Sequence, residues 1–170
     1  MEKPRIRHIA INVEDLDKTA EYYKKVFGME EKHRRPGGTI YLSDGHFDLA
    51  LIHTDKYPWG IHHFGFKVDS LNEIKTKLSQ LDPPISLGSR PNDGRYTEVR
   101  ILDPDGNGVD VAERGWGTRD DKNLPGVRYI GIKTNNPERL AEFYKYIFSM
   151  KEVDRMDNPR TESRAIYLSD

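Results

Sequence analysis

The sequence contains no cysteine among its 170 residues. This absence excludes disulfide bonds, thiolate metal ligands and cysteine nucleophiles, so a tightly bound metal would have to be held by histidine, aspartate or glutamate. The chain also lacks a long apolar run, and no stretch approaches the roughly 20 apolar residues that a membrane-spanning helix needs. We therefore expect a cytoplasmic protein with no membrane partner.

An excess of charge of either sign is also missing. The 27 lysine and arginine residues nearly balance the 28 aspartate and glutamate residues, which leaves a formal net charge of -1. Without a basic field to attract phosphates, we expect no nucleic-acid partner. The length allows one domain with a sizeable core, together with part of another.

Three segments of the chain repeat one pattern of strand, turn and helix, which is typical of a modular fold. The strands that open the three copies are expected at residues 6–13, 61–68 and 127–134, where apolar residues alternate with others. In the first copy, Asp15 is expected to begin the helix and Gly28 to end it.

The helices of the other two copies have equally clear beginnings. Ser70 or Asp69 caps the second helix, and Asn136 caps the third, with Pro137 in its first turn. The larger apolar residues at helical spacing are expected to pack in the core; they include Tyr22, Tyr23, Val26, Phe27, Phe143 and Tyr144.

Short strands follow each helix and complete a βαβββ module, so we predict an α+β protein built from paired modules. In the first copy these strands are expected at residues 29–35, 39–43 and 47–53, and in the second at residues 85–88, 95–102 and 108–113.

The domain boundaries follow from the repeat. Residues 1–115 are expected to form a two-module domain, residues 116–126 a linker, and residues 127–170 an incomplete third module, whose last five residues repeat residues 40–44. An incomplete module leaves a sheet edge open. We favour a fragment of a four-module protein; the alternative is a homodimer formed through the third module.

Two histidines occupy equivalent places in the first two copies. His8 and His63 stand at the same position of the repeated strand, and pseudo-twofold packing of the modules would bring them together. Two imidazoles require an anionic third ligand to hold a divalent metal with open positions for substrate. Asp110 and Glu113 are the candidates; strand alternation turns Asp110 toward the histidines, whereas Glu113 would need a bulge.

Polar side chains on the same strands are candidates for contact with a small-molecule substrate. Arg100 could pair with a carboxylate or phosphate, and Tyr96 or Glu98 is the candidate for proton transfer. The other expected substrate-binding residues are Asn12, Lys67, Tyr41 and Asp48.

Residues 7–16, 63–69 and 102–111 together resemble the vicinal oxygen chelate superfamily, which includes glyoxalase I, bleomycin-resistance proteins and extradiol dioxygenases. The resemblance implies a curved, open-barrel mixed sheet with the helices outside. It also implies a divalent metal (Fe, Mn, Zn or Ni) held by His8, His63 and Asp110, acting on a substrate with vicinal oxygens. The alternative within the superfamily is a metal-free, resistance-type module that binds a small molecule.

Three departures from the family pattern leave the reaction open. Ala50 stands where glyoxalase I has a fourth, acidic ligand, with Asp48 two residues away. Arg100 stands where extradiol dioxygenases have a tyrosine. Asp110 replaces the usual glutamate, and the Gly-Trp-Gly run after Glu113 resembles the dioxygenase pattern, which keeps Glu113 as the alternative ligand.

Overall fold

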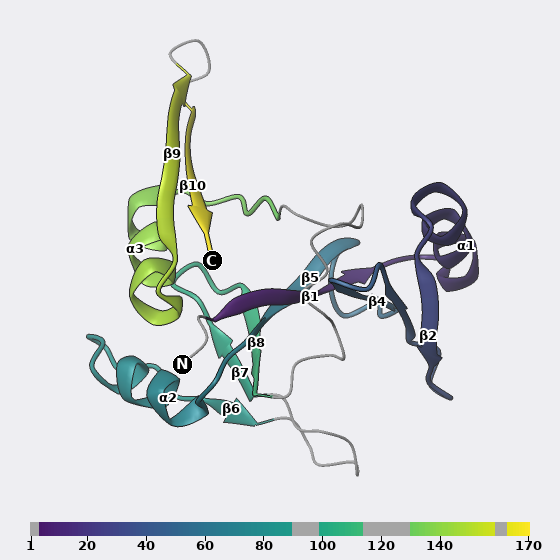
Figure 1. Ribbon diagram of the computed structural model, residues 1–170, viewed down its shortest axis with the longest axis horizontal. Helices are drawn as coiled ribbons and strands as arrows, with labels where there is room; N and C mark the ends of the chain where they lie inside the picture. The colour runs from purple at the N-terminus through teal and green to yellow at the C-terminus, as the bar shows by residue number, and fades with distance from the viewer. Residues whose placement is uncertain (1–3, 90–98, 114–129, 159–162) are drawn as a thin grey trace. The chain divides into compact units, whose positions relative to one another are not determined.

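The computed structural model describes residues 4–89, 99–113, 130–158 and 163–170. The chain divides into two compact units. The first unit includes residues 6–67, and the second includes residues 68–113 and 131–170. Figure 1 labels the elements of both units. Among the described residues, no helix has the length and apolar character needed to cross a bilayer.

The first unit is a helix packed on a mixed sheet. Its elements are β1 (Arg5–Asn12), α1 (Leu16–Phe27), β2 (Glu30–Arg34), β3 (Ile40–Ser43), β4 (Asp48–Ile52) and β5 (Gly60–Lys67). The strands lie in the order β2-β3-β4-β1-β5. Strand β1 runs parallel to β4, while β3 is antiparallel to both β2 and β4. The parallel register places His8 opposite Asp48.

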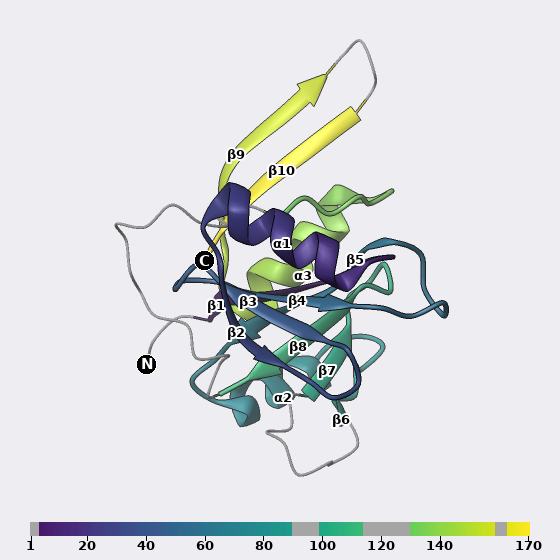
Figure 2. The same cartoon turned by 90° about the vertical axis from the view of Figure 1, so that its right-hand side faces the viewer.

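Helix α1 begins and ends where the sequence predicts. The Asp15 carboxylate accepts a hydrogen bond from the Lys18 amide, and Gly28 ends the helix in the left-handed region with a φ of 66°. The helix contacts β2, β3 and β4, and it buries Ala20. Figure 2 labels α1 together with these strands.

The predicted burial of the large apolar residues of α1 is wrong. Tyr22, Val26 and Phe27 are 54%, 55% and 58% exposed. A helix that rests on one sheet buries a single stripe, and in α1 this stripe passes through the small residue Ala20. The aromatic side of the helix would need a second neighbour to be covered.

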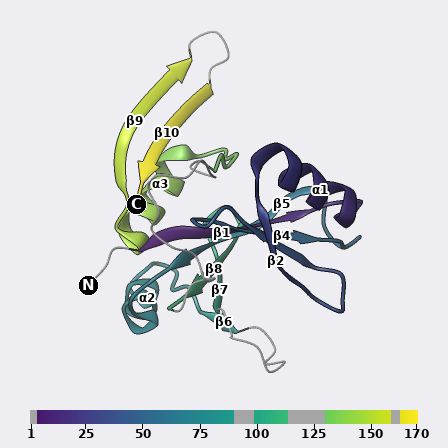
Figure 3. The ribbon, with the colours of Figure 1, turned by 45° about the vertical axis from the view of Figure 1, so that its right-hand side comes forward.

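The second unit contains the remaining helices and strands. They are α2 (Leu71–Ser79), β6 (Gly88–Ser89), β7 (Val99–Leu102), β8 (Gly108–Ala112), α3 (Pro137–Phe148), β9 (Lys151–Asn158) and β10 (Ser163–Ser169). Strand β7 is antiparallel to both β8 and β6. Strands β9 and β10 form a separate hairpin next to α3, which Figure 3 shows clearly. Ser70 and Asn136 cap α2 and α3 as predicted.

In the second unit one predicted strand is wrong and another begins later than predicted. Residues 130–134, the described part of the expected third opening strand, are irregular. In the first copy the equivalent strand β1 pairs with β4, and the described part of the third copy offers no such neighbour. Strand β6 is limited to Gly88–Ser89, because the Ile85 amide donates to the Leu78 carbonyl at the end of α2 instead of joining the ladder. The predicted linker and residues 127–129 lie outside the described residues.

The predicted α+β class is confirmed. Among the described strands, β2 and β6 each pair with a single neighbour, β3 and β7 respectively, so the described sheet is not closed. The prediction that residues 1–115 form one domain is not tested by these features and stays a prediction.

Candidate metal centre

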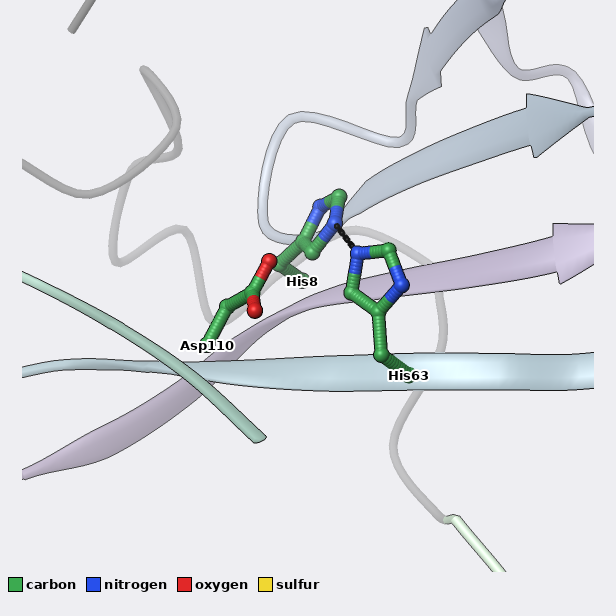
Figure 4. Close-up of side chains that lie close together, drawn as sticks. All are labelled: His8, His63 and Asp110. Atoms are coloured by element: carbon green, nitrogen blue, oxygen red, sulfur yellow. Dashed lines mark hydrogen bonds between the residues drawn. The ribbon is translucent and has the colours of Figure 1, made fainter. Parts of the chain in front are cut away.

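The first unit brings His8 and His63 together. His8 lies on β1 and His63 on β5, and both are almost fully buried, at 2% and 6% exposure. Their Nε2 atoms face each other at 3.2 Å, the contact marked by the dashed line in Figure 4. Equivalent positions in the repeat therefore converge, as the sequence suggested.

Asp48 fixes the orientation of His8. Its Oδ2 atom lies 2.7 Å from Nδ1 of His8, and both side chains are buried. In the tautomer with the proton on Nδ1, His8 donates to the Asp48 carboxylate, and its Nε2 atom can act as a metal ligand. The expected contact of Asp48 with a substrate stays a prediction; in the structure Asp48 lies against His8.

His62 has a similar relation to His63. The Nδ1 atoms of these neighbouring residues lie 2.7 Å apart. When His62 donates, a continuous chain of hydrogen bonds runs through His63 and His8 to Asp48. When His63 donates to His62, the Nε2 lone pairs of His8 and His63 point at each other, an arrangement that repels unless a cation lies between them.

The spacing of the two Nε2 atoms fits a single metal ion. Metal–nitrogen bonds of about 2.0–2.1 Å at a tetrahedral angle place two ligand nitrogens about 3.3 Å apart. The observed separation is 3.2 Å. The donor chemistry of His8 and His63 and their geometry thus both suit a divalent first-row metal.

Asp110 is a buried carboxylate of the second unit, with no exposed surface. It lies on β8, next to Arg100 on the neighbouring strand β7. Arg100 donates two hydrogen bonds to the carboxylate, from Nε to Oδ1 at 2.6 Å and from Nη2 to Oδ2 at 3.0 Å. A carboxylate oxygen can accept more than one bond, so pairing with Arg100 does not prevent Asp110 from acting as a ligand. Arg100, expected to bind substrate, is paired with this carboxylate.

Glu113 is placed elsewhere in the second unit. Its Oε1 accepts a hydrogen bond from the Leu71 amide at 2.9 Å, at the first residue of α2. A carboxylate at a helix N-terminus is favourably placed relative to the free amides and the helix dipole. This contact accounts for Glu113 without a metal.

The other expected substrate residues have varied surroundings. Asn12 is buried and anchors the loop after β4: its amide group donates to the Thr54 and Tyr57 carbonyls at 2.9 and 2.8 Å, and its oxygen accepts from the Thr54 amide. Tyr41 is half-buried on β3, with the Arg35 guanidinium 4.8 Å from its ring centre. Lys67 is half-buried at the end of β5. Tyr96 and Glu98 lie outside the described residues.

Sequence reasoning missed the two outer partners, Asp48 for His8 and His62 for His63. The sequence does not predict that Asp48 pairs with His8, because nothing in it gives the register of β1 against β4. Strand alternation predicts that His62 and His63 point to opposite faces, yet the His62 ring reaches Nδ1 of His63.

Curated relatives resemble the chain at low identity. The "Probable lactoylglutathione lyase, chloroplastic" of Arabidopsis thaliana is 26% identical over 173 residues, which covers 93% of this chain and 48% of that protein. This chain therefore spans about half the length of that relative. The "Probable trivalent organoarsenical cleaving enzyme" of Bacillus subtilis strain 168 is 29% identical over 107 residues, covering 59% of this chain and 73% of the relative.

Solved structures share the fold. The 2,3-dioxygenase LapB from Pseudomonas sp. KL28 superposes with a TM-score of 0.70 at 18% identity, covering 97% of this chain and 65% of that one. The sequence model of the Glyoxalase/Bleomycin resistance protein/Dioxygenase superfamily matches residues 5–111, well over half of the chain. The chain belongs to this superfamily.

Proposed function

We propose that the protein is a divalent-metal-dependent enzyme that acts on a small molecule with two adjacent oxygen atoms, and that His8, His63 and Asp110 hold the metal. The observation that carries the proposal is the pair of buried Nε2 atoms at 3.2 Å. His8 and His63 each offer a buried imidazole nitrogen, and Asp110 offers a buried carboxylate oxygen.

The ligand set is two nitrogens and one carboxylate, which suits Fe, Mn, Zn or Ni. Such an ion, when bound, supplies a Lewis acid and a template for adjacent substrate oxygens. The chain's own residues prepare the site: Asp48 keeps the proton on Nδ1 of His8, and Arg100 holds the Asp110 carboxylate in place. Asp110 rather than Glu113 is the proposed third ligand, since Glu113 is engaged at the start of α2.

The substrate contacts are proposed from the strands around the histidines. Lys67 and Tyr41 are the proposed substrate-binding residues, and Tyr96 or Glu98 the proposed proton-transfer group. Relatives named as a lactoylglutathione lyase and a methylmalonyl-CoA epimerase support a small-molecule substrate. A cytoplasmic location and self-association through the third module remain predictions.

Metal analysis of protein purified without chelators tests the proposal. Stoichiometric metal is expected in the unaltered protein, with loss of that metal in both His8→Ala and His63→Ala. His33→Ala is the matched control, because His33 is an exposed histidine on β2 of the same unit. Negligible metal in all four proteins, each shown to be folded by circular dichroism, would contradict the proposal and favour a metal-free binding module.

A further inference from the structure

Arg35 carries a positive charge that the described part of the chain does not balance. Its side chain is half-buried after the end of β2, and its Nε atom is buried without a hydrogen-bond partner. Among the described residues, no carboxylate forms an ion pair with it. A buried N–H group that loses water without gaining an acceptor costs free energy, and such groups are rare in folded proteins. The exposed charge and the buried Nε of Arg35 therefore call for a physical reason.

The hairpin of β2 and β3 fixes where this guanidinium lies. The Arg35 amide donates to the Thr39 carbonyl at 2.9 Å, which closes the hairpin. His33 pairs with Tyr41 across the two strands, and strand alternation turns Arg35 to the same face as this pair. The guanidinium carbon lies 4.8 Å from the centre of the Tyr41 ring, which is within the range of a cation–π contact. The ring thus holds the charged group in place.

Tyr41 belongs to a row of residues that crosses the sheet of the first unit. It pairs with Ala50 on β4, and Ala50 pairs with Ala10 on β1. Paired residues share a face, and Ala10 comes two residues after His8, so the row lies on the face that carries His8. Strands are about 4.8 Å apart and same-face residues about 7 Å, so roughly 12 Å separates the Cα atoms of Tyr41 and His8. Arg35 therefore shares a face with the candidate metal ligand but lies at a distance from it.

Other arginines of the chain show which group suits the Nε side of a guanidinium. Arg34 and Arg155 each direct Nε and Nη2 at the two oxygens of a glutamate. Arg100 binds the Asp110 carboxylate in the same way. A flat carboxylate matches this fork of two N–H groups in both shape and charge. The acceptor that Arg35 requires is thus of the same kind.

We propose that Arg35 binds a carboxylate group of the substrate. The carboxylate accepts the Nε hydrogen and balances the charge, while the Tyr41 ring holds the guanidinium in position. The separation from His8 makes this carboxylate a second anchoring group, away from the adjacent oxygens that meet the metal. The substrate class is an elongated small molecule with a carboxylate at one end. Assigning the carboxylate to the substrate rests on the proposed function, whereas binding at Arg35 is measured without a metal.

The Nε–H signal of Arg35 in nitrogen-15 NMR spectra reports this contact directly. Sodium acetate is the probe, titrated into metal-free protein and compared with sodium chloride at the same ionic strength. Acetate is expected to shift the signal along a saturable curve, and chloride to leave it in place. Arg35→Gln should weaken acetate binding by about tenfold or more, followed by the backbone amide signals of residues 33–41, because a hydrogen bond between charged groups contributes at least that factor.

Arg34→Gln is the matched control, because Arg34 is the neighbouring arginine but is paired with Asp17 and Glu31. This variant should bind acetate as the unaltered protein does. Methanesulfonate, which carries the same single charge on a tetrahedral group, should bind more weakly than acetate.

Three results would overturn the proposal. They are an Arg35 Nε–H signal that does not respond to acetate, an equal loss of binding in Arg34→Gln and Arg35→Gln, and tighter binding of methanesulfonate than of acetate. None of them depends on metal content, so failure of this inference and failure of the proposed function are distinguished by separate measurements.

Discussion

Replacing Asp48 with alanine should weaken metal binding while leaving both histidines present. The Asp48 carboxylate is the acceptor that fixes Nδ1 of His8, at 2.7 Å and only 5% exposed. Loss of an outer-shell partner of a metal-binding histidine typically costs 10–100-fold in affinity, or about 1.4–2.7 kcal/mol. Asp48→Asn keeps an oxygen acceptor without the charge, so its loss should be the smaller of the two.

The assay is competition between the protein and a metal-binding dye at fixed pH and salt. Asp55→Ala serves as the control, because Asp55 is an exposed aspartate of the same unit. Unfolding by urea is measured in parallel, since loss of the buried hydrogen bond between His8 and Asp48 should also cost about 1–3 kcal/mol of stability. A folded Asp48→Ala protein that binds metal as tightly as the unaltered one would refute the role assigned to this carboxylate.

Three further predictions concern stability. Arg100→Met should destabilise the protein by about 1–3 kcal/mol, because it removes both hydrogen bonds that Arg100 donates to the buried Asp110 carboxylate; adding Asp110→Asn should recover part of this loss in urea titrations, and failure to do so would contradict the argument. Asn12→Ala should cost about 1–3 kcal/mol and speed proteolysis in the loop at 54–58; unchanged cleavage there would show that the loop does not depend on Asn12. Burial raises the pKa of the Tyr144 phenol. The stability that the neutral phenol contributes is therefore fully present below the ordinary tyrosine pKa of about 10, and it declines as the pH rises above that value. Denaturation midpoints of Tyr144→Phe should show less of this alkaline decline.

Local signals in the sequence were enough to locate the helices. Asp15, Ser70 and Asn136 begin them as predicted, because a capping side chain bonds to amides only two or three residues away. The repeat also brought His8 and His63 into one prediction, since equivalent positions of related modules share an environment.

Features that depend on distant partners were not predictable. The pairing of His8 with Asp48 depends on the register of two strands separated by 40 residues, which no local pattern encodes. The exposure of Phe27 was missed for a related reason: periodicity shows which face of a helix is apolar, but not whether a neighbour is present to cover it.

The parallel pairing of β1 with β4 has a consequence for how such a site can vary. Residues added to the turn at 36–38 would change the rim of the first unit but leave the cross-strand partnership of His8 and Asp48 undisturbed. One residue inserted within β4 would instead turn every side chain that follows it in the strand to the opposite face of the sheet. Loop length is therefore free to diversify around this centre, whereas strand length is not.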